Sequence, residues 1–229
     1  ISLYVHVPFC AAKCLYCDFF SVPRGSVTAE KELAVARATV EQAGFLLEAM
    51  GMALGAGEVG LPIEQRLAAA GPWIETLYIG GGTPSLVSAE TLATLLAPFH
   101  GLLLKEWSVE ANPESLDERF LATCASAGVS RLSLGIQSMQ DRALALLGRP
   151  GSRGDNERAL ELLAEGWTGE VNLDFIAGIP GQTAAEVRSD LSALSVVQAR
   201  HASLYSLTLE PGTGLAAAVE EGSIVLNDP

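Results

Sequence analysis

Residues 75–99 read ETLYIGGGTPSLVSAETLATLLAPF and contain one complete strand–loop–helix unit. The first six residues favour a short strand, and SAETLATLLAPF has the amphipathic periodicity of a helix. Three consecutive glycines stand between them, and glycine lets a backbone approach a ligand closely or adopt a positive φ. Taken alone, the GGGTP sequence is equally compatible with an ordinary tight turn.

The same unit recurs along the whole chain. An unbroken alternation of strands and helices predicts an α/β fold with a parallel sheet. Because the order never switches, we expect an incomplete (β/α)6 barrel of parallel strands, with the chemistry at the carboxyl ends of the strands. The region 27–73 is less regular, with a helix over 29–50, a loop over 51–62 and a short helix after it. Strands are predicted at residues 2–7, 75–80, 106–111, 131–136, 170–176 and 202–207.

Composition limits the classes of protein that this chain can belong to. Its 229 residues are 49% hydrophobic and 18% charged, so a disordered chain is excluded. A net charge of −13 makes nucleic acid an unfavourable partner. No apolar run is long enough to span a membrane, and no signal peptide is visible, so we expect a cytoplasmic protein. The chain begins without Met, which suggests a piece of a longer protein.

Three of the four cysteines follow the first predicted strand. Cys10, Cys14 and Cys17 have the spacing C-x3-C-x2-C. Disulfides are rare in the cytosol, and three thiols cannot all pair, so metal ligation is the leading interpretation. Zinc bound with His6 and unrelated free thiols are the alternatives. Three thiolates on a [4Fe–4S] cluster would leave one iron open to a small ligand. Cys124 lies in a predicted helix and is expected to be a buried apolar residue.

Polar residues also stand where other predicted strands end. Burying the carboxylates of Glu110 and Asp174 in an apolar core would destabilise the fold, whereas a carboxylate at the mouth of a barrel can stay solvated or bind a ligand. Gln137 can donate and accept hydrogen bonds, which suits hydroxyl groups. Arg149 follows a short helix and has the fork geometry that matches a carboxylate. The structural alternatives are a solvated Glu, a polar residue at a helix entry, and an Arg that interacts with the helix dipole.

The segment YVHVPFCAAKCLYCDF, residues 4–19, resembles the radical S-adenosylmethionine (SAM) superfamily. Within it, the segment is similar to the coproporphyrinogen III oxidase-like group, which includes the oxidase HemN and the heme chaperone HemW. The resemblance implies a [4Fe–4S] cluster on Cys10, Cys14 and Cys17, whose open iron binds SAM. GGGTP, VEANP and LEPGT extend the likeness from Leu3 to Thr213.

The resemblance also implies which residues bind SAM. Backbone at the glycine loop and the carboxylate of Glu110 would receive the amino group, and Arg149 the carboxylate. Gln137 and Asp174 would hold the ribose, and the backbone of Thr208 the adenine. The family commonly has a His two positions after Arg149, where this chain has Gly151. The full implied set is Tyr4, Tyr16, Gly81, Gly82, Thr83, Glu110, Gln137, Arg149, Asp174 and Thr208; no catalytic residue is assigned.

Within the group, Phe19 stands where HemN enzymes have a further Cys, and Ser21 follows, as in HemW. The resemblance therefore implies a HemW-like heme chaperone, with a radical SAM core over 1–213 and the start of a C-terminal extension over 214–229. Heme or porphyrin, a heme-acceptor protein and an electron donor are the implied partners, with heme bound by the full-length protein. The alternatives are an oxygen-independent coproporphyrinogen III oxidase, which decarboxylates propionates, or a radical SAM enzyme with another substrate, so enzymatic activity stays open.

Overall fold

The computed structural model describes residues 1–51 and 62–226 of the chain. Six parallel strands form one sheet in the order β1-β4-β5-β6-β7-β8. This order follows the sequence without a switch, which confirms the predicted incomplete (β/α)6 arrangement. The six strands are β1 Ser2–Val7, β4 Thr76–Gly81, β5 Glu106–Ala111, β6 Arg131–Gln137, β7 Glu170–Ala177 and β8 His201–Ser206.

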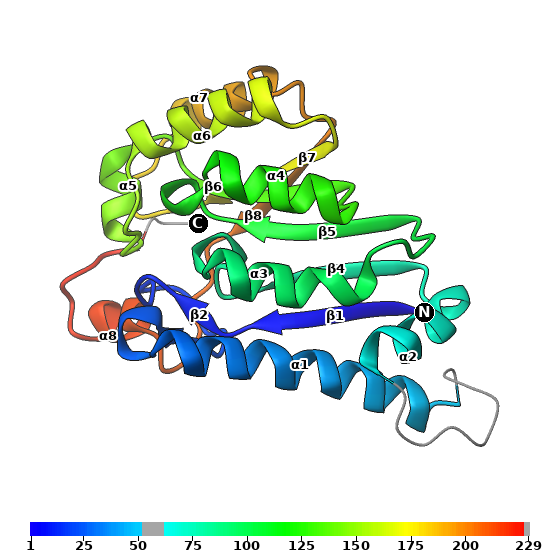
Figure 1. Cartoon of the computed structure of the whole chain (residues 1–229). Helices are drawn as coiled ribbons and strands as arrows, with labels where there is room; N and C mark the ends of the chain where they lie inside the picture. The colour runs from blue at the N-terminus through cyan, green and yellow to red at the C-terminus, as the bar shows by residue number, and fades with distance from the viewer. Residues whose placement is uncertain (52–61, 227–229) are drawn as a thin grey trace.

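Helices connect consecutive strands and pack along one face of the sheet, where α1, α3, α4 and α6 lie next to one another (Figure 1). Their starts are fixed locally, because Thr28, Ser88, Asp117 and Ser152 each accept a hydrogen bond from an amide of the first turn. The helices are α1 Ala29–Ala49, α2 Ile63–Ala70, α3 Ala89–Leu96, α4 Glu118–Ala127, α5 Asp141–Leu146, α6 Arg153–Gly166, α7 Ala184–Leu191 and α8 Gly214–Glu220.

The two faces of the sheet differ in polarity. Strand residues that alternate in sequence point to opposite faces. On β6 and β7, Leu132, Leu134 and Leu173 are fully buried in the core beneath the helices. Ser133 and Asp174, one position away, line a cavity on the other face. The sheet therefore buries an apolar outer face and turns polar side chains inward.

Two further strands were not predicted. β2, Phe9–Cys10, pairs in parallel with β3, Val22–Pro23, and the amide of Val22 donates to the carbonyl of Pro8 at 2.8 Å. This short pairing closes the loop that carries the cysteines. Two-residue strands have no periodicity that a sequence could reveal.

The region 27–73 is helical at both of its predicted segments, α1 and α2. Most of the loop predicted over 51–62 lies outside the described residues. None of the helices in the described parts of the chain is long and apolar enough to cross a bilayer.

A buried carboxylate joins α1 to the start of α3. Glu32 is 1% exposed and accepts hydrogen bonds from the amide of Ser88 at 2.8 Å and from Nε of Arg24 at 2.6 Å. Burial alone would raise the pKa of Glu32, but the Ser88 amide and the Arg24 guanidinium outweigh it and hold the pKa below its ordinary value. The ionised carboxylate therefore stabilises the fold.

We expect Glu32→Gln to lower the free energy of unfolding by about 1.5–3 kcal/mol at neutral pH, the value of a hydrogen bond to a charged group. Because the folded-state pKa is lowered, the stabilisation is present above the ordinary carboxyl pKa and is lost as the pH falls through the folded value. Urea unfolding followed by circular dichroism should therefore show a wild-type advantage that shrinks on acidification. Glu165→Gln, at an exposed position of α6, is the control and should be neutral. An advantage that does not depend on pH would contradict this role.

Candidate functional site

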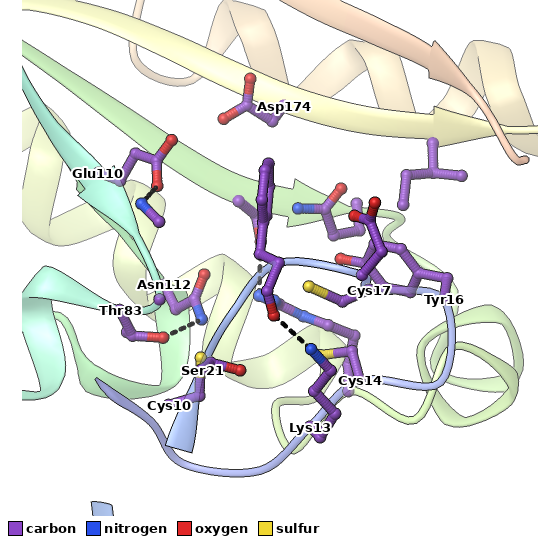
Figure 2. A pocket seen from close by; sticks show the side chains of 18 of the residues that line it. Cys10, Lys13, Cys14, Tyr16, Cys17, Ser21, Thr83, Glu110, Asn112 and Asp174 are labelled. Atoms are coloured by element: carbon purple, nitrogen blue, oxygen red, sulfur yellow. Dashed lines mark hydrogen bonds between the residues drawn. The ribbon is translucent and has the colours of Figure 1, made fainter. Parts of the chain in front are cut away.

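A cavity of about 410 Å³ opens at the carboxyl ends of the strands. Figure 2 shows the cysteine sulfur atoms at one end of it and the carboxylates of Glu110 and Asp174 at the other. Cys10, Cys14 and Cys17 all line the cavity. So do nine of the residues that the sequence singled out, namely Tyr16, Gly81, Gly82, Thr83, Glu110, Gln137, Arg149, Asp174 and Thr208.

Tyr4 is the predicted site residue that the structure does not bring to the lining. Its side chain is 53% exposed, and its hydroxyl lies 3.2 Å from Nδ1 of His6. Its ring stacks on Tyr78 with 6.0 Å between the ring centroids, and Tyr78 does line the cavity. Tyr4 therefore supports the site from behind Tyr78.

The cysteine loop is fastened to two distant segments through Leu15. The Leu15 amide donates to the carbonyl of Leu147 at 2.9 Å, and its own carbonyl accepts from the amide of Leu215, at the start of α8, at 2.7 Å. A Cβ atom on Gly148 or Gly214 would lie 2.7 or 2.8 Å from the Leu15 side chain. The two glycines thus leave the space into which Leu15 fits.

All four cysteines are free thiols in the part of the chain that the structure describes. Cys10, Cys14 and Cys17 are partly buried, whereas Cys124 is fully buried in α4, as predicted. Burial raises the pKa of the Cys14 thiol, against the nearby guanidinium of Arg149, which lowers it. Across residues 1–51 and 62–226, no three His, Cys, Asp or Glu side chains converge closely enough to hold a metal ion as they stand.

Glu110 is held against the glycine loop. It accepts hydrogen bonds from the Tyr78 hydroxyl at 2.8 Å and from the Gly81 amide at 2.9 Å. A Cβ atom on Gly80 would lie 2.5 Å from the Glu110 carboxyl carbon, so this close approach requires glycine. Burial raises the pKa of Glu110 above its ordinary range, and the charge of Asp174 adds to the effect, although the bonds from Tyr78 and Gly81 oppose it. A cationic group in the cavity would stabilise the charged form.

Asp174 faces the cavity from β7, as its position in an otherwise apolar strand predicts. Its two oxygens accept hydrogen bonds from Oγ of Ser133 at 2.8 Å and from Nδ2 of Asn172 at 2.7 Å. Each carboxylate oxygen can accept a further bond. Asp174 can therefore hold a pair of donors, such as two neighbouring hydroxyl groups, in the cavity.

Arg149 brings a buried positive charge to the cysteine end of the cavity. Its side chain is 7% exposed, and its Nη2 donates to the Gly135 carbonyl at 2.9 Å and lies 3.7 Å from Oε2 of Glu114. That Glu114 oxygen is buried without a hydrogen-bond partner among the described residues. A Cβ atom on Gly151 would lie 3.1 Å from it, so Gly151 leaves room beside the carboxylate. An orphaned oxygen next to a buried guanidinium is the setting of a site that takes a polar ligand.

Several lining residues were missed by sequence reasoning. Lys13 precedes a predicted ligand, and its ammonium donates to the carbonyl of Phe19. Asn112 donates to Thr83 at 3.1 Å and to Glu114 at 3.2 Å. Tyr78 and Ser133 could have been found, because each stands at an inward position two residues before a glycine of its own strand.

Comparisons with known proteins give matches over most of the chain. The family model of the radical SAM superfamily matches residues 4–194. The heme chaperone HemW of Mycobacterium tuberculosis is 39% identical to this chain. The aligned region covers 99% of this chain and 54% of that protein. Radical S-adenosyl methionine domain-containing protein 1, mitochondrial, of Mus musculus is 38% identical over 100% of this chain and 48% of its own. The chain thus spans about half the length of these relatives.

Solved structures show the same fold. Coproporphyrinogen III oxidase (HemN) from Escherichia coli superimposes with a TM-score of 0.68 at 23% identity, over 100% of this chain and 48% of that one. The methyltransferase TsrM from Kitasatospora setae, solved with cobalamin and a [4Fe-4S] cluster, superimposes with a TM-score of 0.64 at 19% identity.

We expect Gly148→Ala to loosen the cysteine loop. The substitution costs about 1–2 kcal/mol for a left-handed residue, and it also displaces Leu15, because Gly148 has a φ of +68° and a Cβ would meet that side chain. Gly101→Ala is the matched control, since Gly101 has a φ of +80° with nothing within 4 Å of its Cβ position. Gly148→Ala should lose more thermal stability than the control, and a thiol reagent should modify its cysteines faster. Equal losses and equal rates would show that Leu15 does not anchor the loop.

Proposed function

The chain belongs to the radical SAM superfamily, and on that premise we propose that it is the [4Fe–4S]- and SAM-binding core of a HemW-like heme chaperone. The observation that carries the proposal is that three free thiols and nine predicted SAM-binding residues line one cavity. These residues lie in β4, β5, β6 and β7 and in the segments that follow β1, β4, β6 and β8. All six strands of the sheet are therefore needed to bring them to one cavity, because they are far apart in the sequence.

The residues present fit the two cofactors that the family implies. Three thiols are the soft donors that iron–sulfur clusters take, and their number leaves one iron open. The orphaned oxygen of Glu114 and the buried charge of Arg149 lie beside them, where a polar ligand can be held. When bound, a reduced cluster of this kind supplies the electron that cleaves SAM. The protein supplies binding, orientation and electrostatics.

We assign the groups of SAM by charge. Arg149 receives the carboxylate, because a guanidinium matches it with two parallel hydrogen bonds. Glu110, with the backbone of Gly81, Gly82 and Thr83 beside it, receives the cationic amino group. Asp174 and Gln137 hold the ribose hydroxyls, Thr208 contacts the adenine through its backbone, and Tyr16 packs beside the cluster ligands.

The remaining proposals concern the protein around this core. We propose heme or a porphyrin as its ligand in the longer protein, with a heme-acceptor protein and an electron donor as partners. Free thiols persist in reducing compartments, which supports a cytoplasmic location. We place the core at residues 1–213 and the start of a further segment at 214–229, which touches the core through the bond from Leu215 to Leu15.

Iron loading tests the cluster ligands. After anaerobic reconstitution we expect about four irons per chain, as three thiolates on a cube with an open iron imply. Serine at Cys10, Cys14 or Cys17 should abolish the cluster absorption, because a hydroxyl does not replace a thiolate as a soft ligand. Cys124→Ser is the control and should load iron normally, since Cys124 lies in α4 away from the cavity lining. Normal loading of Cys14→Ser would refute the assignment.

A heme titration followed by Soret absorbance tests the chaperone function. Residues 1–229 should bind heme weakly, because none of the three histidines, His6, His100 and His201, lines the cavity. The net charge of −13 also repels the propionates. Protein with the length of the relatives should bind heme tightly.

Two outcomes would redirect the proposal. Stoichiometric binding by residues 1–229 that is lost in His201→Ala would place the heme site at the amino end of β8. Turnover of coproporphyrinogen by the longer protein, without heme binding, would favour the oxidase.

A further inference from the structure

We propose that Asn156 and Asp190, two buried residues outside the cavity, are positioning residues that hold Gln137 in its place in the SAM site. The inference rests on the proposed SAM-binding function. Neither residue lines the cavity, and each comes from a helix on the outer face of the sheet, Asn156 from α6 and Asp190 from α7.

Gln137 has a backbone conformation that a non-glycine residue adopts only under constraint. Its φ is +62°, and the amide of Ser138 donates to the carbonyl of Ile136 at 2.8 Å. A hydrogen bond between residues i and i+2 around a residue with positive φ is the rare and strained form of the γ-turn. The pairing of β6 with β7 shifts between Gly135 and Gln137, so the turn coincides with an irregularity in the sheet.

The turn directs the Gln137 side chain into the cavity. A Cβ atom on Gly135 would lie 2.9 Å from Nε2 of Gln137 and 2.9 Å from Oδ1 of Asn112. The side-chain amide of Gln137 therefore lies over the backbone of Gly135, at the end of the cavity that contains Arg149. If the turn relaxed to a negative φ, the side chain would leave this position.

Asn156 forms hydrogen bonds with the backbone carbonyl groups of the two residues on either side of Gln137. Its Nδ2 donates to the carbonyl of Ser138 at 2.9 Å and to that of Ile136 at 3.2 Å. Asn156 is 3% exposed, and Ser138 and Ile136 are fully buried. Without this amide, both carbonyls would lose a buried donor, so Asn156 favours the conformation that brings them together.

Asp190 accepts hydrogen bonds from the three residues that follow Gln137 in the sequence. Its Oδ2 accepts from Oγ of Ser138 at 2.8 Å, and its Oδ1 accepts from the amide of Met139 at 2.9 Å and from Nε2 of Gln140 at 3.2 Å. Asp190 is 2% exposed, and a buried carboxylate is retained only with such donors. The two helices thus hold the strained turn from both sides of Gln137.

A purely structural role for Asp190 would lower stability without a specific effect on the ligand. Asp190→Ala and the control Glu32→Ala separate the two roles, because each removes a buried carboxylate that accepts a backbone amide, and Glu32 does not line the cavity. We expect both variants to lose thermal stability. In the reconstituted protein, calorimetry with SAM should show about tenfold weaker binding for Asp190→Ala and unchanged binding for Glu32→Ala.

A double-mutant cycle with Gln137→Ala tests the route of the effect. If Asp190 acts through Gln137, Asp190→Ala should weaken SAM binding less than twofold in the Gln137→Ala background. A tenfold loss in both backgrounds, or unchanged binding in Asp190→Ala, would overturn the inference. Should Asp190→Ala fail to fold, Asn156→Leu, which keeps the volume but removes the donors, carries the same cycle.

Failure of the proposed function has a different signature. Wild-type protein with a full iron content that does not bind SAM would refute the function itself. If the wild-type protein binds SAM and Asp190→Ala binds it equally tightly, the positioning role alone is refuted.

Discussion

Burial of the outer face of the sheet beneath the helices is the interaction on which the rest of the structure depends. Leu77, Ile79, Val109 and Leu134 are almost completely removed from water by α1, α3, α4 and α6. At about 25 cal/mol per Å² of buried apolar surface, this packing is the main stabilising contribution. Because side chains alternate along a strand, fixing the apolar positions outward also turns the polar positions inward.

The polar side chains inside the sheet can be buried without a large loss of stability only because they form hydrogen bonds with one another. Glu110 uses Tyr78 and Gly81, and Asp174 uses Ser133 and Asn172. The carboxylates of Glu110 and Asp174 lie at one end of the cavity and the thiols at the other (Figure 2). The guanidinium of Arg149 is next to the Cys14 thiol. A ligand that carries both cationic and anionic groups is complementary to this distribution of charge.

The cysteine loop and the turn at Gln137, both at the opening of the cavity, are held in position by segments that are far away in the sequence. Leu15 is fastened to residues 147 and 215, and the turn at Gln137 is held from α6 and α7. A loop with three potential metal ligands, closed only by two-residue strands, has little stability of its own. Its position is therefore a property of the whole domain, and substitutions such as those at Gly148 act on it from outside.

The parallel strand order, the cysteine loop after the first strand and twelve of the residues that line the cavity were all predictable from the sequence. Periodicity and motif spacing are local signals, and in an unswitched α/β fold the strand ends meet at one edge. Three features became visible only in the folded chain: Tyr4 stacks on Tyr78, Glu114 has a buried oxygen without a hydrogen-bond partner among the described residues, and Asp190 accepts a hydrogen bond from Ser138. The reason is physical: these contacts join side chains across packed elements, and their partners are set by distance in space, on which local sequence patterns carry no information.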